Sequence, residues 1–302
     1  MRRTLPWSVP ASAWRSIKER ALPKELIDAE GFVFDMDGTL VLGDKASAGQ
    51  KALPGAVETL ELLRERGVPY QIFTNGTART PEWYANAMRA TGLDVRDEEF
   101  MTPSTAAAHY LKDKGAGRIL VLGREPVWKP LADLGLDVVE SPGDGGTYDA
   151  IYVGWFREFT FPDLEAATHA IWAGAKLTTA SDVPFFAAAG ADKRGIGTSF
   201  AINAMLKALT GAEAHVLGKP SLDALQVAKS RMGLSPDARI VVVGDDPQLE
   251  PKMANLGGAY SVGVTTGIYD EAAFASREDP SERPALLLSG IDKLAALLRE
   301  GA

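Results

Sequence analysis

Residues 31–39, Gly-Phe-Val-Phe-Asp-Met-Asp-Gly-Thr, join an apolar run to a turn that holds two carboxylates. The run 31–34 predicts a buried strand, and Asp35 and Asp37 follow at its carboxyl end, where open α/β sheets bind ligands. Two residues apart on an extended chain, the two side chains project to the same side. Carboxylates placed together repel each other, and hard oxygen ligands of this kind favour Mg²⁺. An Asp-Gly turn without function is the simpler interpretation, and these nine residues alone leave it open.

Strand and helix patterns alternate along the rest of the chain. A helix should begin near Pro54-Gly55, Tyr70–Phe73 predicts a second strand and Ile240–Val243 a third. Further strands are expected at 118–122, 148–153 and 176–180, with a helix over 163–175. The alternation predicts an α/β protein with a Rossmann-like core, in which a parallel sheet carries helices on both faces. We expect a discontinuous core, residues 1–102 and 212–302, and an inserted α/β cap domain, residues 103–211.

Three more polar elements stand beside predicted strands. Thr74, Asn75 and Gly76 follow the second strand, where a hydroxyl and backbone N–H groups could hold phosphate oxygens. Lys219 is a single positive charge between Gly and Pro, and Asp245 ends the most apolar strand of the chain. Taken alone, each has a simpler interpretation as a turn or a surface lysine.

Together and in this order, the four elements resemble the motifs of the haloacid dehalogenase (HAD) superfamily. The family's motifs match Phe32–Thr39, Thr74-Asn75, Lys219 and Gly244-Asp245. The chain is also similar to the NagD-like branch, subfamily IIA, which includes p-nitrophenyl-phosphatase-like enzymes and has an α/β cap. That similarity is carried by Leu53–Ala56, Phe73–Thr80, Tyr152–Gly154, Gly195–Thr198 and Val216–Ser221. The resemblance covers about residues 30–265.

The resemblance implies a Mg²⁺-dependent phosphatase that forms an aspartyl-phosphate. Asp35 would be the nucleophile and Asp37 the acid/base, and both would hold the metal with Asp245. Thr74 and Lys219 would bind the phosphoryl group, with Asn75 and Gly76 beside them. The substrate would be a small phosphorylated metabolite of the sugar, polyol, nucleotide or pyridoxal phosphate class.

Two positions depart from the family pattern. Members usually have Gly-Asp-x-x-x-Thr-Asp, whereas this chain has Glu250 at the last position. Glu250 or Asp246 would then serve near the water shell of the metal. Members also tend to have Asp two residues after the Val-Gly of the cap, where this chain has Phe156. Neither departure touches the predicted nucleophile.

Composition limits the partners and the location. With 32 basic and 40 acidic residues the formal charge is −8, which argues against nucleic acid as a partner. The chain has no cysteine, which suits the cytoplasm, and no apolar run is long enough to span a membrane. The basic start, which contains Trp7 and Trp14, is either a targeting segment or a solvated arm. A homodimer formed through the cap is a further expectation. The three histidines show no metal-ligand spacing.

Other functions fit parts of the pattern. A carbon–halogen hydrolase would use Asp35 but would need neither a metal nor Asp37. A phosphotransferase or mutase of this superfamily mostly carries a different, helical cap. The altered fourth motif would also fit a catalytically inactive binding or scaffold protein. Metal-dependent turnover of an aryl phosphate separates the phosphatase from the dehalogenase and the scaffold.

Overall fold

The computed structural model describes residues 23–44, 49–187 and 194–301, and these residues form two compact units. The first unit contains the described residues up to Thr74, Glu82–Phe100 and the described residues from Ala228 onward. The second contains Asn75–Pro81 and the described residues of Met101–Val227. The predicted domain boundaries, 1–102 with 212–302 and 103–211, stay a prediction. The basic start of the chain, with Trp7 and Trp14, lies outside the described residues.

A six-stranded sheet forms the centre of the first unit, in the order β15-β14-β13-β1-β4-β5. Neighbouring strands from β15 to β4 pair in parallel, and Phe34 of β1 lies opposite Val243 of β13. Both β1 and β13 are buried along their whole length, which explains their unbroken apolar sequences. The predicted strands at 31–34, 70–73 and 240–243 are therefore confirmed. The bounds are β1 Gly31–Phe34, β4 Tyr70–Phe73, β5 Phe100–Met101, β13 Ile240–Gly244, β14 Tyr260–Val264 and β15 Leu286–Leu288.

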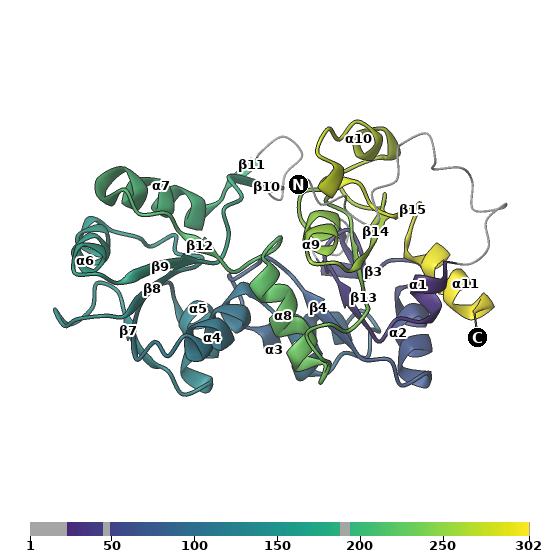
Figure 1. The fold of residues 1–302 in the computed structure, drawn as a ribbon, viewed down its shortest axis with the longest axis horizontal. Coiled ribbons are helices and arrows are strands. Elements are labelled where there is room, and N and C mark those ends of the chain that lie inside the picture. The colour runs from purple at the N-terminus through teal and green to yellow at the C-terminus, as the bar shows by residue number, and fades with distance from the viewer. Residues whose placement is uncertain (1–22, 45–48, 188–193, 302) are drawn as a thin grey trace. The chain divides into compact units, whose positions relative to one another are not determined.

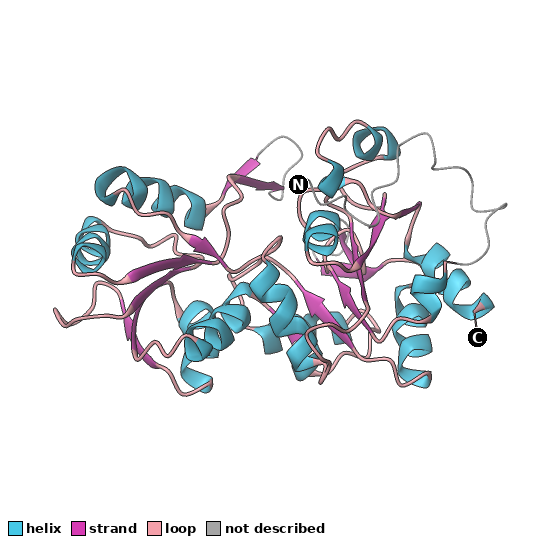
Figure 2. Ribbon diagram, in the orientation of Figure 1, coloured by secondary structure: helices cyan, strands magenta, loops and turns pink. Residues whose placement is uncertain are grey.

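Helices cover both faces of this sheet (Figure 2). Helix α2, predicted near residues 54–55, begins at Ala56 and packs with α11 at the far end of the chain. Between β1 and α2 lies a two-stranded hairpin of β2 and β3. The bounds are α1 Lys24–Ile27, β2 Val41–Asp44, β3 Gly49–Ala52, α2 Ala56–Glu65, α3 Pro81–Arg89, η3 Asp97–Glu99, α9 Glu250–Leu256, α10 Glu271–Ala275, η4 Pro280–Glu282 and α11 Ile291–Glu300.

The second unit has its own five-stranded parallel sheet, in the order β12-β9-β8-β6-β7 (Figure 1). Helix α4 packs with α5 and helix α6 packs with α7, and strands β10 and β11 pair in antiparallel. The bounds are α4 Pro103–Asp113, β6 Arg118–Leu122, α5 Glu125–Asp133, β7 Asp137–Glu140, β8 Ala150–Val153, α6 Phe161–Trp172, β9 Lys176–Thr179, β10 Phe185–Ala187, β11 Arg194–Ile196, α7 Thr198–Thr210, β12 His215–Val216 and α8 Leu222–Arg231.

The helix predicted over 163–175 is found as α6, Phe161–Trp172, and the strand predicted at 148–153 is found as β8, Ala150–Val153. Helix α6 begins at Phe161 and not at 163, because Thr160 and Asp163 form a capping box in which the Thr160 N–H donates to Asp163 Oδ2 at 2.7 Å. Phe156 and Phe159 pack in the apolar core of the unit, with their rings edge to face. The Phe156 departure from the family pattern is thus a core residue in this chain.

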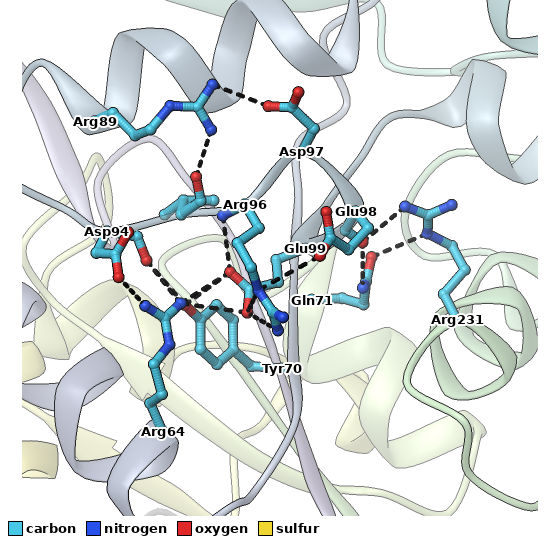
Figure 3. Close-up of polar contacts among 11 residues, drawn as sticks. Arg64, Tyr70, Gln71, Arg89, Asp94, Arg96, Asp97, Glu98, Glu99 and Arg231 are labelled. Carbon is cyan, nitrogen blue, oxygen red and sulfur yellow. Dashed lines mark hydrogen bonds and ion pairs between the residues drawn. The ribbon is translucent and has the colours of Figure 1, made fainter.

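A polar cluster holds the amino end of β4 in the first unit (Figure 3). The carboxylate of Glu99 is 5% exposed and accepts hydrogen bonds from Arg64, Arg96 and the hydroxyl of Tyr70. Burial and the Glu99 carboxylate raise the pKa of Tyr70 above its ordinary value. The cluster fixes η3 against the strand whose other end leads to Thr74.

None of the helices in the described ranges is both long and apolar enough to cross a membrane.

Candidate active site

Asp35 and Asp245 follow two neighbouring strands of the first unit. Asp35 comes directly after β1 and Asp245 directly after β13, and the Asp35 N–H donates to the Val243 carbonyl at 2.9 Å. Parallel pairing places the carboxyl ends of these strands at one edge of the sheet. Both side chains are largely removed from solvent, with 7% and 8% of their surface exposed. Buried carboxylates are costly unless they are bonded or bind cations, so Asp35 and Asp245 are candidate functional residues.

The hydroxyl of Thr39 orients the Asp35 carboxylate. Thr39 is fully buried, and its Oγ1 donates to Asp35 Oδ2 at 3.3 Å. The turn between them is closed by backbone hydrogen bonds from Leu40 and Val41 to the Met36 carbonyl, both at 3.0 Å. The Asp-Met-Asp-Gly-Thr sequence therefore forms a tight loop that supports its own first carboxylate.

The Asp245 carboxylate lies against the backbone of that loop. Gly38 has φ +82°, and a Cβ there would lie 2.6 Å from Asp245 Oδ2. The loop after β14 closes on the same carboxylate: a Cβ on Gly267 would overlap with it, and the Ile268 N–H donates to Oδ2 at 3.2 Å. The hydroxyl of Thr266 also donates to the Gly38 carbonyl at 2.5 Å. Only glycine permits these close approaches.

Residues 266–268 were missed by the sequence reasoning. These residues contact the site through backbone groups and one hydroxyl group, so a search for charged side chains does not find them. The Thr-Thr-Gly run at 265–267, directly after a predictable strand, is the signal that could have found them.

Glu250 lies beneath the loop that carries Asp245. Its side chain is 1% exposed and packs so closely on Gly244 that a Cβ there would overlap with the carboxyl group. The Asp246 N–H points to Glu250 Oε2 at 3.3 Å, while Asp246 Oδ1 accepts from the Gln248 N–H at 2.9 Å. The residue that departs from the family pattern thus supports the backbone on both sides of Asp245.

The second motif is divided between the two units, with Thr74 in the first and Asn75 and Gly76 in the second. Within the second unit, Asn75 holds the backbone of Lys219, which lies 144 residues further along the chain. The Asn75 Nδ2 donates to the Lys219 carbonyl at 3.1 Å, and the Lys219 N–H donates to Asn75 Oδ1 at 2.7 Å. Lys219 itself is only 2% exposed.

A hydrogen bond also joins Thr77, just after the second motif, to the segment that follows β8. The Trp155 N–H, directly after β8 and Gly154, donates to Thr77 Oγ1 at 3.0 Å. The Trp155 ring contacts Phe186 edge to face, and Arg157 lies over it at 5.5 Å. Trp155 is half-buried and is not among the buried residues of the core cluster, which include Phe156.

The donor set suits a hard divalent cation. Asp35 and Asp245 offer carboxylate oxygens at one sheet edge, with Asp37 two residues further on. Within the described ranges, no three His, Asp or Glu side chains converge closely enough to hold an ion by themselves. Mg²⁺ does not require such a cage, since it usually keeps several waters and binds one or two carboxylates together with substrate phosphate. The residues present therefore fit Mg²⁺.

Comparison with known proteins agrees with this geometry. A family model of haloacid dehalogenase-like hydrolases matches residues 32–137, and a second HAD-hydrolase-like model matches residues 216–294. The chain belongs to the haloacid dehalogenase-like hydrolase family. Within this family it is a phosphoric monoester hydrolase of the NagD-like branch, subfamily IIA.

Individual relatives match over most of their length. A dihydroxyacetone phosphatase from Corynebacterium glutamicum is 28% identical over 87% of this chain and 90% of its own. A 4-nitrophenylphosphatase from Thermotoga maritima has a TM-score of 0.77 at 26% identity, covering 90% of this chain and 98% of its own. A glycerol phosphate phosphatase from Mycobacterium tuberculosis, solved with magnesium, has a TM-score of 0.76 at 27% identity, covering 91% and 79%. The same enzyme has also been solved with calcium.

Proposed function

We propose that this chain hydrolyses a small phosphorylated metabolite through an aspartyl-phosphate on Asp35. One observation carries the proposal. Asp35 and Asp245 are buried at the ends of two neighbouring strands, and the Asp245 carboxylate lies against the loop that carries Asp35 and Asp37. Two buried carboxylates in this position are suited to a nucleophile and a metal ligand.

Asp35 would act as the nucleophile. One oxygen of its carboxylate forms a bond to phosphorus while the bond from phosphorus to the leaving oxygen breaks, which yields an acyl-phosphate. Thr39, bonded to Oδ2, would keep the carboxylate in one orientation during this step. Water then attacks the phosphorus of the acyl-phosphate, phosphate leaves and the Asp35 carboxylate is regenerated. Dividing the hydrolysis into two steps addresses a reaction that is extremely slow in water.

Asp37 would move the proton in both steps. It donates a proton to the leaving oxygen as the bond to phosphorus breaks, and later takes a proton from the attacking water. Its side chain is exposed, in contrast to that of Asp35, so it can reach groups outside the loop. The two carboxylates would thus have different roles because they have different surroundings.

Asp35, Asp37 and Asp245 would hold Mg²⁺. When bound, the ion offsets negative charge on the phosphoryl oxygens and on the nucleophile. Glu250 and Asp246 would support this site by holding the loop that presents Asp245. The magnesium complex of the glycerol phosphate phosphatase supports the choice of ion.

Thr74, Asn75, Gly76 and Lys219 would bind the phosphoryl group. The Thr74 hydroxyl and the following backbone N–H groups suit phosphate oxygens, and Lys219 supplies a positive charge. The two hydrogen bonds between Asn75 and the Lys219 backbone support the assignment, because they join the second and third motifs.

The proteins to which this chain is similar include a dihydroxyacetone phosphatase, acid sugar phosphatases, a 5′-nucleotidase and chronophin. We propose a substrate among the phosphates of sugars, polyols, nucleotides or pyridoxal. The absence of cysteine supports a cytoplasmic location. A homodimer through the second unit stays a prediction, and the exposed Phe161 and Trp172 of α6 are the side chains to replace in a test of oligomeric state.

The deciding experiment is a phosphate-release assay on the full chain with Mg²⁺. The substrates are dihydroxyacetone phosphate, glycerol 3-phosphate, phosphoglycolate, sugar phosphates, nucleoside monophosphates, pyridoxal phosphate and p-nitrophenyl phosphate. We expect turnover of at least one metabolite, and Asp35→Asn should abolish it while leaving the circular-dichroism melt unchanged. Residual activity above about 1% in Asp35→Asn would exclude Asp35 as the nucleophile, because loss of a nucleophile costs far more than a hundredfold.

A further inference from the structure

The hairpin of β2 and β3 is fastened to the loop that carries Asp37. An isolated parallel bridge joins Asp37 to Val41, the first residue of β2. At the base of the hairpin the Leu53 N–H donates to the Leu40 carbonyl at 2.9 Å, and Val41 pairs with Ala52. A side chain on β3 is therefore held by backbone pairing at a defined place relative to Asp37.

From this position on β3, the side chain of Gln50 contacts Asp37. Its Nε2 donates to Asp37 Oδ1 at 3.1 Å, across a separation of 13 residues. Gln50 is half-buried, and no described residue donates to its buried Oε1. A neutral amide that donates to a carboxylate gives a charge-assisted hydrogen bond without adding a competing charge.

The contact matters because Asp37 is exposed. An exposed carboxylate samples several side-chain orientations, whereas a proton donor must lie within hydrogen-bond reach of the leaving oxygen. The orientation of the Asp35 carboxylate is fixed differently, because it is buried and bonded to Thr39. A hydrogen bond from a strand-held amide is a way to orient the second carboxylate.

We propose that Gln50 is a positioning residue that holds the Asp37 carboxyl group for proton transfer to the leaving group. The inference rests on the proposed function. Gln50 engages Oδ1 of this carboxyl group. In the transfer step the proton passes from Asp37 to the leaving oxygen as its bond to phosphorus breaks, and the substrate alcohol departs neutral.

This role predicts a dependence on the leaving group. A simple alkoxide is a poor leaving group and needs the proton, whereas a nitrophenolate leaves readily without it. A residue that only stabilised the hairpin would affect both substrates equally. The ratio of the two kcat/KM values therefore separates positioning from structural support, since kcat/KM covers only the steps through phosphoryl transfer.

The test compares Gln50→Met with the wild-type full chain in Mg²⁺, on glycerol 3-phosphate and on p-nitrophenyl phosphate. Methionine keeps the length of the side chain and removes both polar ends. Lys51→Met, at the exposed neighbouring position of β3, is the matched control for disturbance of the hairpin. Thermal melts and inhibition by inorganic phosphate are measured for each variant.

We expect Gln50→Met to lower kcat/KM for the alkyl ester about tenfold, the size of one charge-assisted hydrogen bond, and for the aryl ester less than about twofold. Lys51→Met should change neither value, and phosphate inhibition should stay as in the wild type. Gln50→Leu, which likewise has no hydrogen-bond donor, should give the same discrimination and serves if Gln50→Met is unstable.

An equal fall for both esters, or no fall, would overturn the positioning role. Should the wild-type chain release no phosphate from either ester, the proposed function itself would fail and this inference with it. If the wild type is active and both Gln50 variants keep its ratio of kcat/KM values for the two esters, the inference alone would be refuted.

Discussion

Replacing Asn75 by alanine tests whether the junction of the second and third motifs serves phosphate binding. The amide makes two hydrogen bonds with the Lys219 backbone, at 2.7 and 3.1 Å. Alanine removes both of these bonds to the Lys219 backbone. Lys219 is nearly buried, so water cannot freely replace the amide.

The expected magnitude follows from these two bonds. Each net contribution is about 0.5–1.5 kcal/mol, so the pair supplies about 1–3 kcal/mol of stabilisation. If all of this energy is lost from binding of the phosphoryl group, kcat/KM falls by about 5- to 150-fold. If the energy is lost from the stability of the fold instead, the melting temperature falls by several degrees.

The assay measures kcat/KM with p-nitrophenyl phosphate, the inhibition constant of inorganic phosphate and the thermal melt. Asn255→Ala is the matched control, because Asn255 Nδ2 also donates to two backbone carbonyls, those of Ser281 and Arg283, both at 2.8 Å. The control should melt at a lower temperature and keep its affinity for phosphate. Asn75→Ala should lose affinity for phosphate.

Retention of wild-type phosphate inhibition and kcat/KM in Asn75→Ala would refute the reasoning, even with a lowered melting temperature. That result would assign the Asn75–Lys219 pair to the fold of the second unit and not to the site. A shared loss of phosphate affinity in both variants would likewise show that the effect follows stability alone.

Three further predictions concern the metal, a close contact and pH. EDTA should abolish phosphate release and Mg²⁺ should restore it, with Ca²⁺ a poor substitute because it prefers a larger, looser oxygen shell; equal turnover in excess EDTA would favour a metal-independent mechanism. Gly267→Ala should displace the Asp245 carboxylate and raise the Mg²⁺ concentration that gives half-maximal activity, and an unchanged Mg²⁺ titration would contradict the contact. Burial raises the pKa of Tyr70 above its ordinary value of about 10, so its contribution to stability is complete below that pH and is lost as pH rises above it. Urea unfolding from pH 8 to 11 should therefore show a steeper alkaline loss of stability in the wild type than in Tyr70→Phe, and parallel curves would refute the assignment.

The sequence by itself determined the strands of the core and the carboxylates at their ends. Unbroken apolar runs such as 31–34 and 240–243 predict buried parallel strands, and both are found. Asp35 follows the first run directly and Asp245 follows the second after Gly244, so their place at the sheet edge needed only the local pattern. The order of the four motifs was enough to indicate the family, which the family models confirm.

Only the tertiary structure decided which side chains support those carboxylates. The Gln50–Asp37, Asn75–Lys219 and Gly267–Asp245 contacts join residues 13 to 144 positions apart, and no local periodicity encodes them. Glu250 illustrates the same limit: its identity was readable from the sequence, whereas its packing on Gly244 depends on how α9 begins after β13. Local patterns report burial and turn chemistry, but the partner of a side chain depends on strand order and on the path of each loop, which the whole chain settles together.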